Sequence, residues 1–286
     1  MNTPIISAED LQTLLQQGAD VRVLDCTFHL DNTALGREQF EREHIAGALY
    51  ANLDTDLSTH NAAQAVNGGR HPLPQREAFA ATLGRWGITP DTQVVAYDQV
   101  GTLTAGRLWW MMRWCGHTSV QILDGGWPAW QAIQGATASG PAKPVEATAP
   151  YPLGAPLETL ITHQEVMAQL GRDSQTLVDA RGAPRYRGET EVLDPVAGHI
   201  PGALNRPYTE NFDAQGHFKS PEVLRAEWSR LLGQRDSASV VAYCGSGVSA
   251  VPNLISLALA GLPAHGLYAG SWSEWSREGL PSATGA

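Results

Sequence analysis

One cysteine stands in a sequence context that could carry out chemistry. Residues 240–250 read VVAYCGSGVSA, so an apolar, strand-forming run delivers Cys244 into a loop with two glycines and two serines. A helical pattern follows over residues 250–261. A strand, a tight loop and a helix N-terminus in this order present backbone N–H groups that favour an anion. The sequence therefore predicts a reactive thiolate at Cys244, rather than a small apolar residue that ends a strand.

The reactions open to such a thiolate differ in the other groups that they need. Phosphate-ester hydrolysis uses an arginine six residues after the cysteine, where this chain has Ala250, and this argues against a phosphatase. A cysteine protease needs a histidine base; none lies in the loop, although His71, His199 and His265 could approach from elsewhere in the chain. Sulfur transfer needs only the thiolate and the amide donors, because the thiolate takes up a sulfur atom as a persulfide and passes it on.

Four motifs occur twice, in the same order and at near-constant spacing. They are VRVLD at 21–25 and TLVDAR at 176–181, HIAGAL at 44–49 and HIPGAL at 199–204, VVAYD at 94–98 and VVAYC at 240–244, and DGGWPAW at 124–130 and AGSWSEW at 269–275. This pattern predicts two copies of one domain. The first copy has Asp98 where the second has Cys244, so only the second copy is expected to be catalytic.

Short strand-forming runs alternate with helical segments in each copy, which predicts an α/β fold with a parallel sheet and helices on both faces. We expect strands at 21–26, 93–98, 120–123, 176–179 and 240–243, and helices at 75–86, 102–115, 162–170, 221–232 and 250–261. Ser7 is expected to cap an earlier helix, with Asp10 three residues on. The predicted domains span residues 1–138 and 158–286, joined by a linker at 139–157 that is rich in proline, alanine and glycine.

Composition excludes several classes of protein. The chain is 43% apolar but has no run long enough to span a membrane, and its N-terminus lacks a secretory signal pattern. Its three cysteines, Cys26, Cys115 and Cys244, are too scattered for a disulfide framework or a metal site. A net charge of -10 argues against nucleic-acid binding. We therefore expect a cytoplasmic protein without cofactor or metal, whose anionic substrate is bound by local arginines.

The duplication, the HIPGAL and AGSWSEW motifs and the CGSGVS loop together resemble the tandem-domain rhodanese-type sulfurtransferases. Within that family, the loop is similar to the CGSGVT loop of 3-mercaptopyruvate sulfurtransferases, with Ser249 in place of threonine. The resemblance implies that Cys244 forms the persulfide and that Arg185 pairs with the substrate carboxylate. It also implies that the loop amides hold the substrate sulfur; these belong to Gly245, Ser246, Gly247, Val248 and Ser249.

Two further implications concern charged and proton-carrying groups. Ser246, His71 and Asp56 match a group that helps proton transfer, although a histidine of a surface loop is the alternative interpretation of His71. Asp194 stands nine residues after Arg185, where many relatives have a second substrate-binding arginine. A carboxylate there would repel the substrate rather than bind it, and Arg187 or Arg206 could substitute for the missing arginine.

The sequence therefore predicts an enzyme that moves sulfur from 3-mercaptopyruvate, through a persulfide on Cys244, to a thiol, a thioredoxin-like protein or cyanide. Thiosulfate as the preferred sulfur donor is one alternative, which Asp194 favours. A persulfide relay protein that is loaded by partner proteins is the other.

Overall fold

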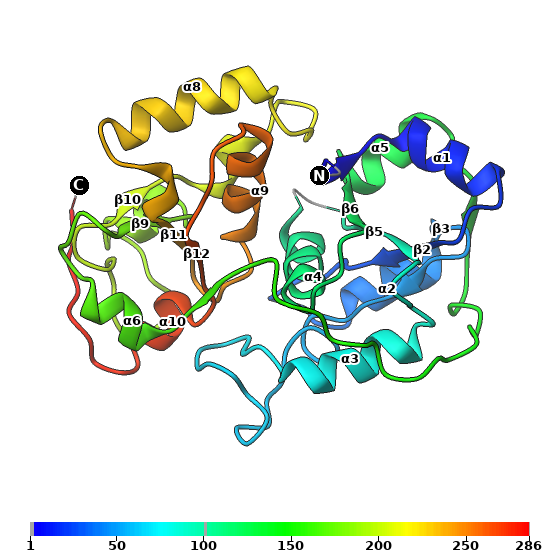
Figure 1. Ribbon diagram of the computed structural model, residues 1–286, viewed down its shortest axis with the longest axis horizontal. Coiled ribbons are helices and arrows are strands. Elements are labelled where there is room, and N and C mark those ends of the chain that lie inside the picture. The colour runs from blue at the N-terminus through cyan, green and yellow to red at the C-terminus, as the bar shows by residue number, and fades with distance from the viewer. Residues whose placement is uncertain (1–2, 100–101, 286) are drawn as a thin grey trace. The chain divides into compact units, whose positions relative to one another are not determined.

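The computed structural model describes residues 3–99 and 102–285. Contacts divide the chain into two units (Figure 1). Unit 1 comprises Met1–Thr59, Pro74–Leu157 and Ala214–His217, and unit 2 comprises His60–Leu73, Glu158–Asp213 and Phe218–Ala286. The predicted linker at 139–157 has neither helix nor strand and belongs to unit 1. A short segment from the first half of the sequence, His60–Leu73, therefore belongs to unit 2.

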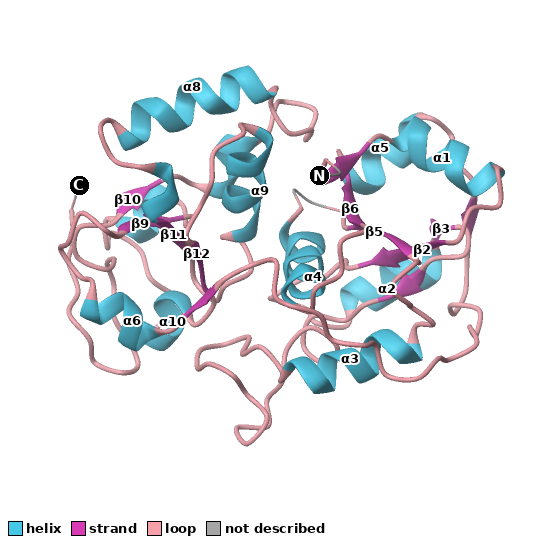
Figure 2. Ribbon diagram, in the orientation of Figure 1, coloured by secondary structure: helices cyan, strands magenta, loops and turns pink. Residues whose placement is uncertain are grey.

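Unit 1 contains a sheet of five parallel strands, with two helices on one face and three on the other. The strand order is β1 (Ile5–Ile6), β6 (Val120–Leu123), β5 (Gln93–Tyr97), β2 (Val21–Asp25) and β4 (Leu49–Tyr50). Helices α1 (Ala8–Gln16), α2 (Leu35–Arg42) and α5 (Gly126–Ala132) pack on the face of Val23 and Val95. Helices α3 (Arg76–Arg85) and α4 (Leu103–Trp114) cover the other face, and β3 (His44–Ile45) pairs with β7 (Thr137–Ala138) (Figure 2).

Unit 2 repeats this architecture. Its parallel strands lie in the order β10 (Leu204–Asn205), β9 (Thr176–Asp179), β11 (Val240–Tyr243), β12 (Gly266–Tyr268) and β8 (Leu160–Ile161). One face is covered by α6 (His163–Ala168), α7 (Ala183–Tyr186) and α10 (Ser271–Trp275), and the other by α8 (Pro221–Leu232) and α9 (Val251–Leu259). Two 3-10 turns, η1 (Tyr208–Asn211) and η2 (Ser237–Ser239), complete the unit. The predicted α/β fold and its duplication are thus confirmed.

The predicted elements agree with the structure except at their ends. Three predicted strands, at 120–123, 176–179 and 240–243, and the helix at 221–232 have the predicted bounds. The other predicted elements end one or two residues earlier, and the helices among them also start one residue later. Ser7 caps α1, because its Oγ accepts a hydrogen bond of 3.1 Å from the Asp10 amide. All four residues of β11 are buried, as expected for a parallel strand covered on both sides.

Equivalent residues of the two units make equivalent contacts. The hydroxyls of Tyr97 and Tyr243 each accept a hydrogen bond of 3.2 Å, from the amides of Ile45 and Ile200. His44 and His199, which begin the matched HIAGAL and HIPGAL motifs, each hydrogen-bond through Nδ1 to a backbone carbonyl. The matched motifs therefore hold the fold together. Within the residues that the structure describes, no helix is long and apolar enough to cross a lipid bilayer.

Candidate functional site

The Cys244 loop begins directly after β11 and is held by the start of α10. The Cys244 amide donates to Ser271 Oγ at 3.0 Å, and its carbonyl accepts from the Trp272 amide at 3.0 Å. The Gly245 carbonyl accepts from the Ser273 amide at 2.9 Å. The side chain of Cys244 is buried. The loop that carries the cysteine is therefore fixed by three hydrogen bonds to one short helix.

Amide donors of this loop remain available for a ligand. Within residues 3–99 and 102–285, the N–H groups of Gly245, Ser246, Val248 and Ser249 have no acceptor. Gly247 has a φ of +73°, and a Cβ there would lie 2.2 Å from the carbonyl oxygen of Ala269, so only glycine fits. A turn with several unused N–H groups is suited to binding an anion.

At the equivalent position of unit 1, a carboxylate side chain binds backbone amides. The Asp98 carboxylate accepts hydrogen bonds from the amides of Thr102, Thr104 and Ala105, at 3.0 to 3.1 Å, where α4 begins. Burial raises the pKa of Asp98 to about 6, although these amides oppose the shift. In the first copy, the Asp98 carboxylate thus binds the backbone N–H groups at the start of α4.

A second polar group reaches the loop from His60–Leu73, the segment of unit 2 that comes from the first half of the chain. His71 Nδ1 lies 2.8 Å from Ser246 Oγ, and both side chains are buried. The structure therefore brings together two of the three residues that the resemblance assigned to proton transfer. Asp56, the third, belongs to unit 1, where it accepts from the Asn52 amide at 2.9 Å and burial raises its pKa.

The structure also locates the two arginines that were predicted to bind substrate. Arg185, on α7, donates from Nη2 to both oxygens of Glu191, at 2.8 and 2.9 Å, and to Asp194 Oδ2 at 3.3 Å. A Cβ placed on Gly245 would lie 3.5 Å from Arg185 Nη1, so this guanidinium adjoins the Cys244 loop. Arg187 is exposed instead, and its Nε and Nη2 donate to Glu189.

Sequence reasoning missed one charged residue beside the loop, Arg70. Its Nη1 donates to Asp194 Oδ1, and its Nη2 would lie 2.9 Å from a Cβ on Gly245. The carboxylate at 194, which seemed to repel a substrate, is therefore paired with two arginines. The signal available in the sequence was weak, since Arg70 merely precedes His71 in a loop with two glycines.

The other two cysteines offer no competing thiolate. Both side chains are fully buried. Burial raises the pKa of Cys26 well above its ordinary value and that of Cys115 to about 11. Both thiols are consequently protonated at neutral pH, where only a thiolate would act as a nucleophile.

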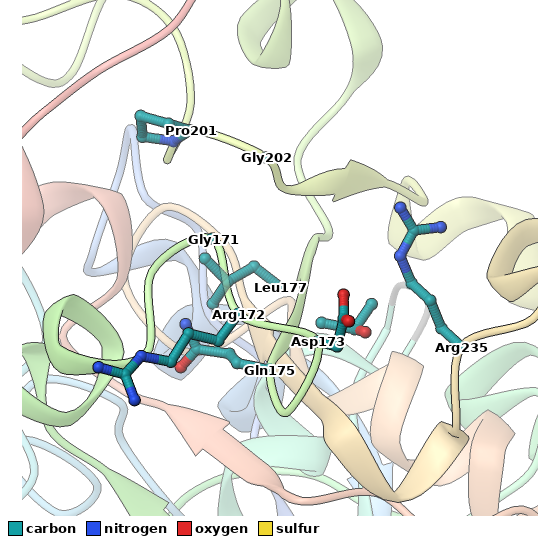
Figure 3. A pocket seen from close by; sticks show the side chains of 9 residues that line it. Gly171, Arg172, Asp173, Gln175, Leu177, Pro201, Gly202 and Arg235 are labelled. Carbon is teal, nitrogen blue, oxygen red and sulfur yellow. The ribbon is translucent and has the colours of Figure 1, made fainter.

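A pocket of about 220 Å³ in unit 2 does not contain the candidate site (Figure 3). It is lined by Gly171, Arg172, Asp173, Gln175, Thr176, Leu177, Pro201, Gly202 and Arg235. Thr176 and Leu177 begin β9, whereas Cys244 follows the last residue of the parallel strand β11. Ligands of parallel sheets bind outside the carboxyl ends of the strands, so this pocket lies at the wrong edge for catalysis.

Comparisons with known proteins agree with the duplication. The model of the rhodanese-like domain matches residues 7–133 and again 162–278. A protein of Pseudomonas aeruginosa described as "Probable 3-mercaptopyruvate sulfurtransferase" is 43% identical over 286 residues, which cover 98% of each chain. The thiosulfate sulfurtransferase of Mus musculus is 32% identical over 92% of this chain and 88% of its own. The solved 3-mercaptopyruvate sulfurtransferase from Leishmania major is 29% identical, with a TM-score of 0.84 over 96% of this chain and 74% of that one.

Proposed function

Because the chain belongs to the rhodanese-like family, we propose that it is a sulfurtransferase that takes sulfur from 3-mercaptopyruvate and passes it to a thiol, a thioredoxin-like protein or cyanide. The single observation that carries the proposal is the Cys244 loop, in which the amides of Gly245, Ser246, Val248 and Ser249 have no acceptor among the described residues. The close relatives named for 3-mercaptopyruvate support this donor over thiosulfate. We place catalysis in the second copy, residues 158–286, with 1–138 and 139–157 as the inactive copy and the linker.

In the first half-reaction, the Cys244 thiolate attacks the sulfur of 3-mercaptopyruvate. A sulfur–sulfur bond forms, the carbon–sulfur bond breaks, and its electron pair leaves with the enolate of pyruvate. The enolate carbon then takes up a proton, which gives pyruvate and a persulfide on Cys244. The amides of residues 245–249 stabilise negative charge on sulfur before and after the transfer.

In the second half-reaction, the acceptor attacks the outer sulfur of the persulfide. The sulfur–sulfur bond breaks and its electron pair returns to Cys244 as the thiolate. A thiol acceptor becomes a persulfide, and cyanide becomes thiocyanate. The Cys244 thiolate must stay reduced for the next cycle, which fits a reducing compartment such as the cytoplasm.

We propose that Ser246 and His71 act together in the proton transfer to the enolate carbon. Their hydrogen bond of 2.8 Å lets the imidazole and the hydroxyl pass a proton between them at the edge of the loop. Asp56 is proposed as the third member of this group, a role that rests on the family resemblance alone. The substrate carboxylate is assigned to Arg185, whose guanidinium adjoins Gly245.

Steady-state kinetics with the two sulfur donors test the proposal. We expect kcat/KM for 3-mercaptopyruvate, followed by pyruvate release, to exceed that for thiosulfate by about tenfold or more, and Cys244→Ser to abolish both. Faster turnover of thiosulfate would favour the thiosulfate enzyme instead. If neither donor is turned over but a persulfide-carrying protein loads Cys244, the relay protein is the better description.

A further inference from the structure

We infer that Ser273 is the positioning residue that sets His71 against Ser246. The inference rests on the proposed function, in which His71 and Ser246 act together in the proton transfer to the enolate carbon. Ser273 acts only through these two residues. Its main chain holds the Cys244 loop and its side chain holds the segment that carries His71, so it fixes the distance between them.

Ser273 lies in α10 and is completely buried. Its amide donates to the Gly245 carbonyl at 2.9 Å, directly before Ser246 in the chain. Its Oγ accepts a hydrogen bond of 3.0 Å from the Arg70 amide, directly before His71. One residue of α10 is therefore bonded to the immediate neighbour of each member of the proton-transfer pair.

These bonds form a closed ring with the hydrogen bond between His71 and Ser246. The ring runs from Ser273 through Gly245 to Ser246, crosses to His71 at 2.8 Å, and returns through Arg70 to Ser273. Each hydrogen bond of a closed ring restricts the geometry of the others. Loss of the Ser273 hydroxyl would open the ring and let His71 move away from Ser246.

The loop over residues 66–73, which carries the histidine of the ring, is also held at a second point. The Val66 amide donates to the Leu73 carbonyl at 2.9 Å, so the two ends of the loop are bonded to each other. The Gly68 amide donates to Glu274 Oε1 at 2.6 Å. Because the loop is closed on itself, a shift at either anchor on α10 would be passed on to the histidine.

Gly69 lets this loop lie directly against Ser273. Its φ is +93°, and a Cβ there would lie 2.6 Å from Ser273 Oγ and 2.8 Å from the Gly270 carbonyl oxygen. The Ser273 hydroxyl donates to the same Gly270 carbonyl at 3.2 Å, which leaves the oxygen free to accept from the loop. The close approach to Ser273 thus requires glycine at position 69.

The copy without the cysteine lacks these polar groups. Alignment of the DGGWPAW and AGSWSEW motifs places Pro128 where the second copy has Ser273, and Ala129 where it has Glu274. Proline has neither an amide N–H nor a hydroxyl, and the alanine side chain has no acceptor. The tryptophans of the two motifs are buried in both copies, namely Trp127, Trp130, Trp272 and Trp275. The packing residues are therefore shared, whereas the positioning residues occur only beside Cys244.

The test uses Ser273→Ala, which removes the hydroxyl and keeps the amide that binds Gly245. We expect the single-turnover rate of pyruvate release from 3-mercaptopyruvate to fall by about tenfold, because a misplacement of about 1 Å can cost up to about a hundredfold. Thiosulfate releases sulfite, which has no carbon to protonate, so the rate of that release should change less than about twofold. Ser276→Ala is the matched control, because in the described part of the chain this buried hydroxyl at the end of α10 has no hydrogen-bond partner.

Two further variants separate positioning from a general loss of structure. The double variant His71→Asn/Ser273→Ala should be no slower than His71→Asn alone, because Ser273 acts through His71. Gly69→Ala pushes the same loop away from α10 and should slow pyruvate release while sparing sulfite release. Equal losses with both donors, or losses that multiply in the double variant, would overturn the assignment.

Nitrogen NMR of protein with isotopically labelled histidine gives a readout that needs no turnover. The Nδ1 resonance of His71 reports the hydrogen bond to Ser246 Oγ. We expect Ser273→Ala to shift this resonance in the same direction as Ser246→Ala, and Ser276→Ala to leave it in place. A resonance that Ser273→Ala does not move contradicts the positioning role. If the resonance moves as expected but the wild type turns over neither donor, the proposed function alone is refuted.

Discussion

Ser246 and His71 meet through one hydrogen bond although they lie 175 positions apart in the sequence. If they pass a proton as one group, removal of either should cost nearly the whole benefit of both. We expect Ser246→Ala and His71→Asn each to lower kcat with 3-mercaptopyruvate by about tenfold to a hundredfold, and the double variant to be no slower than the slower single variant. Losses that multiply in the double variant would show that the two side chains act separately.

The residues of the site differ in how far the sequence could predict them. Cys244 and its counterpart Asp98 follow from motif alignment alone, because each ends a matched motif. Arg70 could not be predicted in this way, since its partner Asp194 lies 124 positions away and the pair has no local pattern. The same lack of pattern made Asp194 look unpaired. A single sequence reveals which residues belong to a motif, but not which distant charges neutralise one another.

The loop between β11 and α9 owes its shape to Gly247. Alanine there would meet the Ala269 carbonyl in addition to the cost of a positive φ. Gly202 has a φ of +78° and open space around it, so alanine at this position would meet only the cost of the positive φ. We expect Gly202→Ala to destabilise the protein by about 1–2 kcal/mol and Gly247→Ala by clearly more, measured by urea unfolding. Equal losses at the two positions would mean that the loop can move away from Ala269.

The loop between β5 and α4 should make stability depend on pH through Asp98. Its folded pKa of about 6 lies above the ordinary aspartate pKa of 3.8, so the folded state binds its proton more tightly. As the pH rises from about 4 to about 6, the wild type loses stability from this group, whereas Asp98→Asn has no such loss. Comparison of urea midpoints should show the difference between the two proteins shift by about 2–3 kcal/mol in favour of the variant between pH 4 and pH 7. A difference that stays constant with pH refutes this assignment.

At the scale of the whole molecule, the sequence predicted the duplication but not which segments of the chain belong to each unit. Four matched motifs predicted two copies, and both sheets have the same strand order. The linker contains no helix or strand, as its composition indicated, yet it packs with unit 1. Segment 60–73 belongs to unit 2 through a few contacts of Gly68, Arg70 and His71, which no periodicity predicts.

The central claim, that Cys244 carries the transferred sulfur, is tested most directly by intact mass spectrometry after a single turnover with 3-mercaptopyruvate and no acceptor. We predict that the wild type gains the mass of one sulfur atom, that peptide mapping places it on Cys244, and that a thiol or cyanide removes it. Cys244→Ser should gain nothing. An unchanged wild-type mass, a sulfur atom mapped to Cys26 or Cys115, or the same gain in Cys244→Ser would contradict the claim.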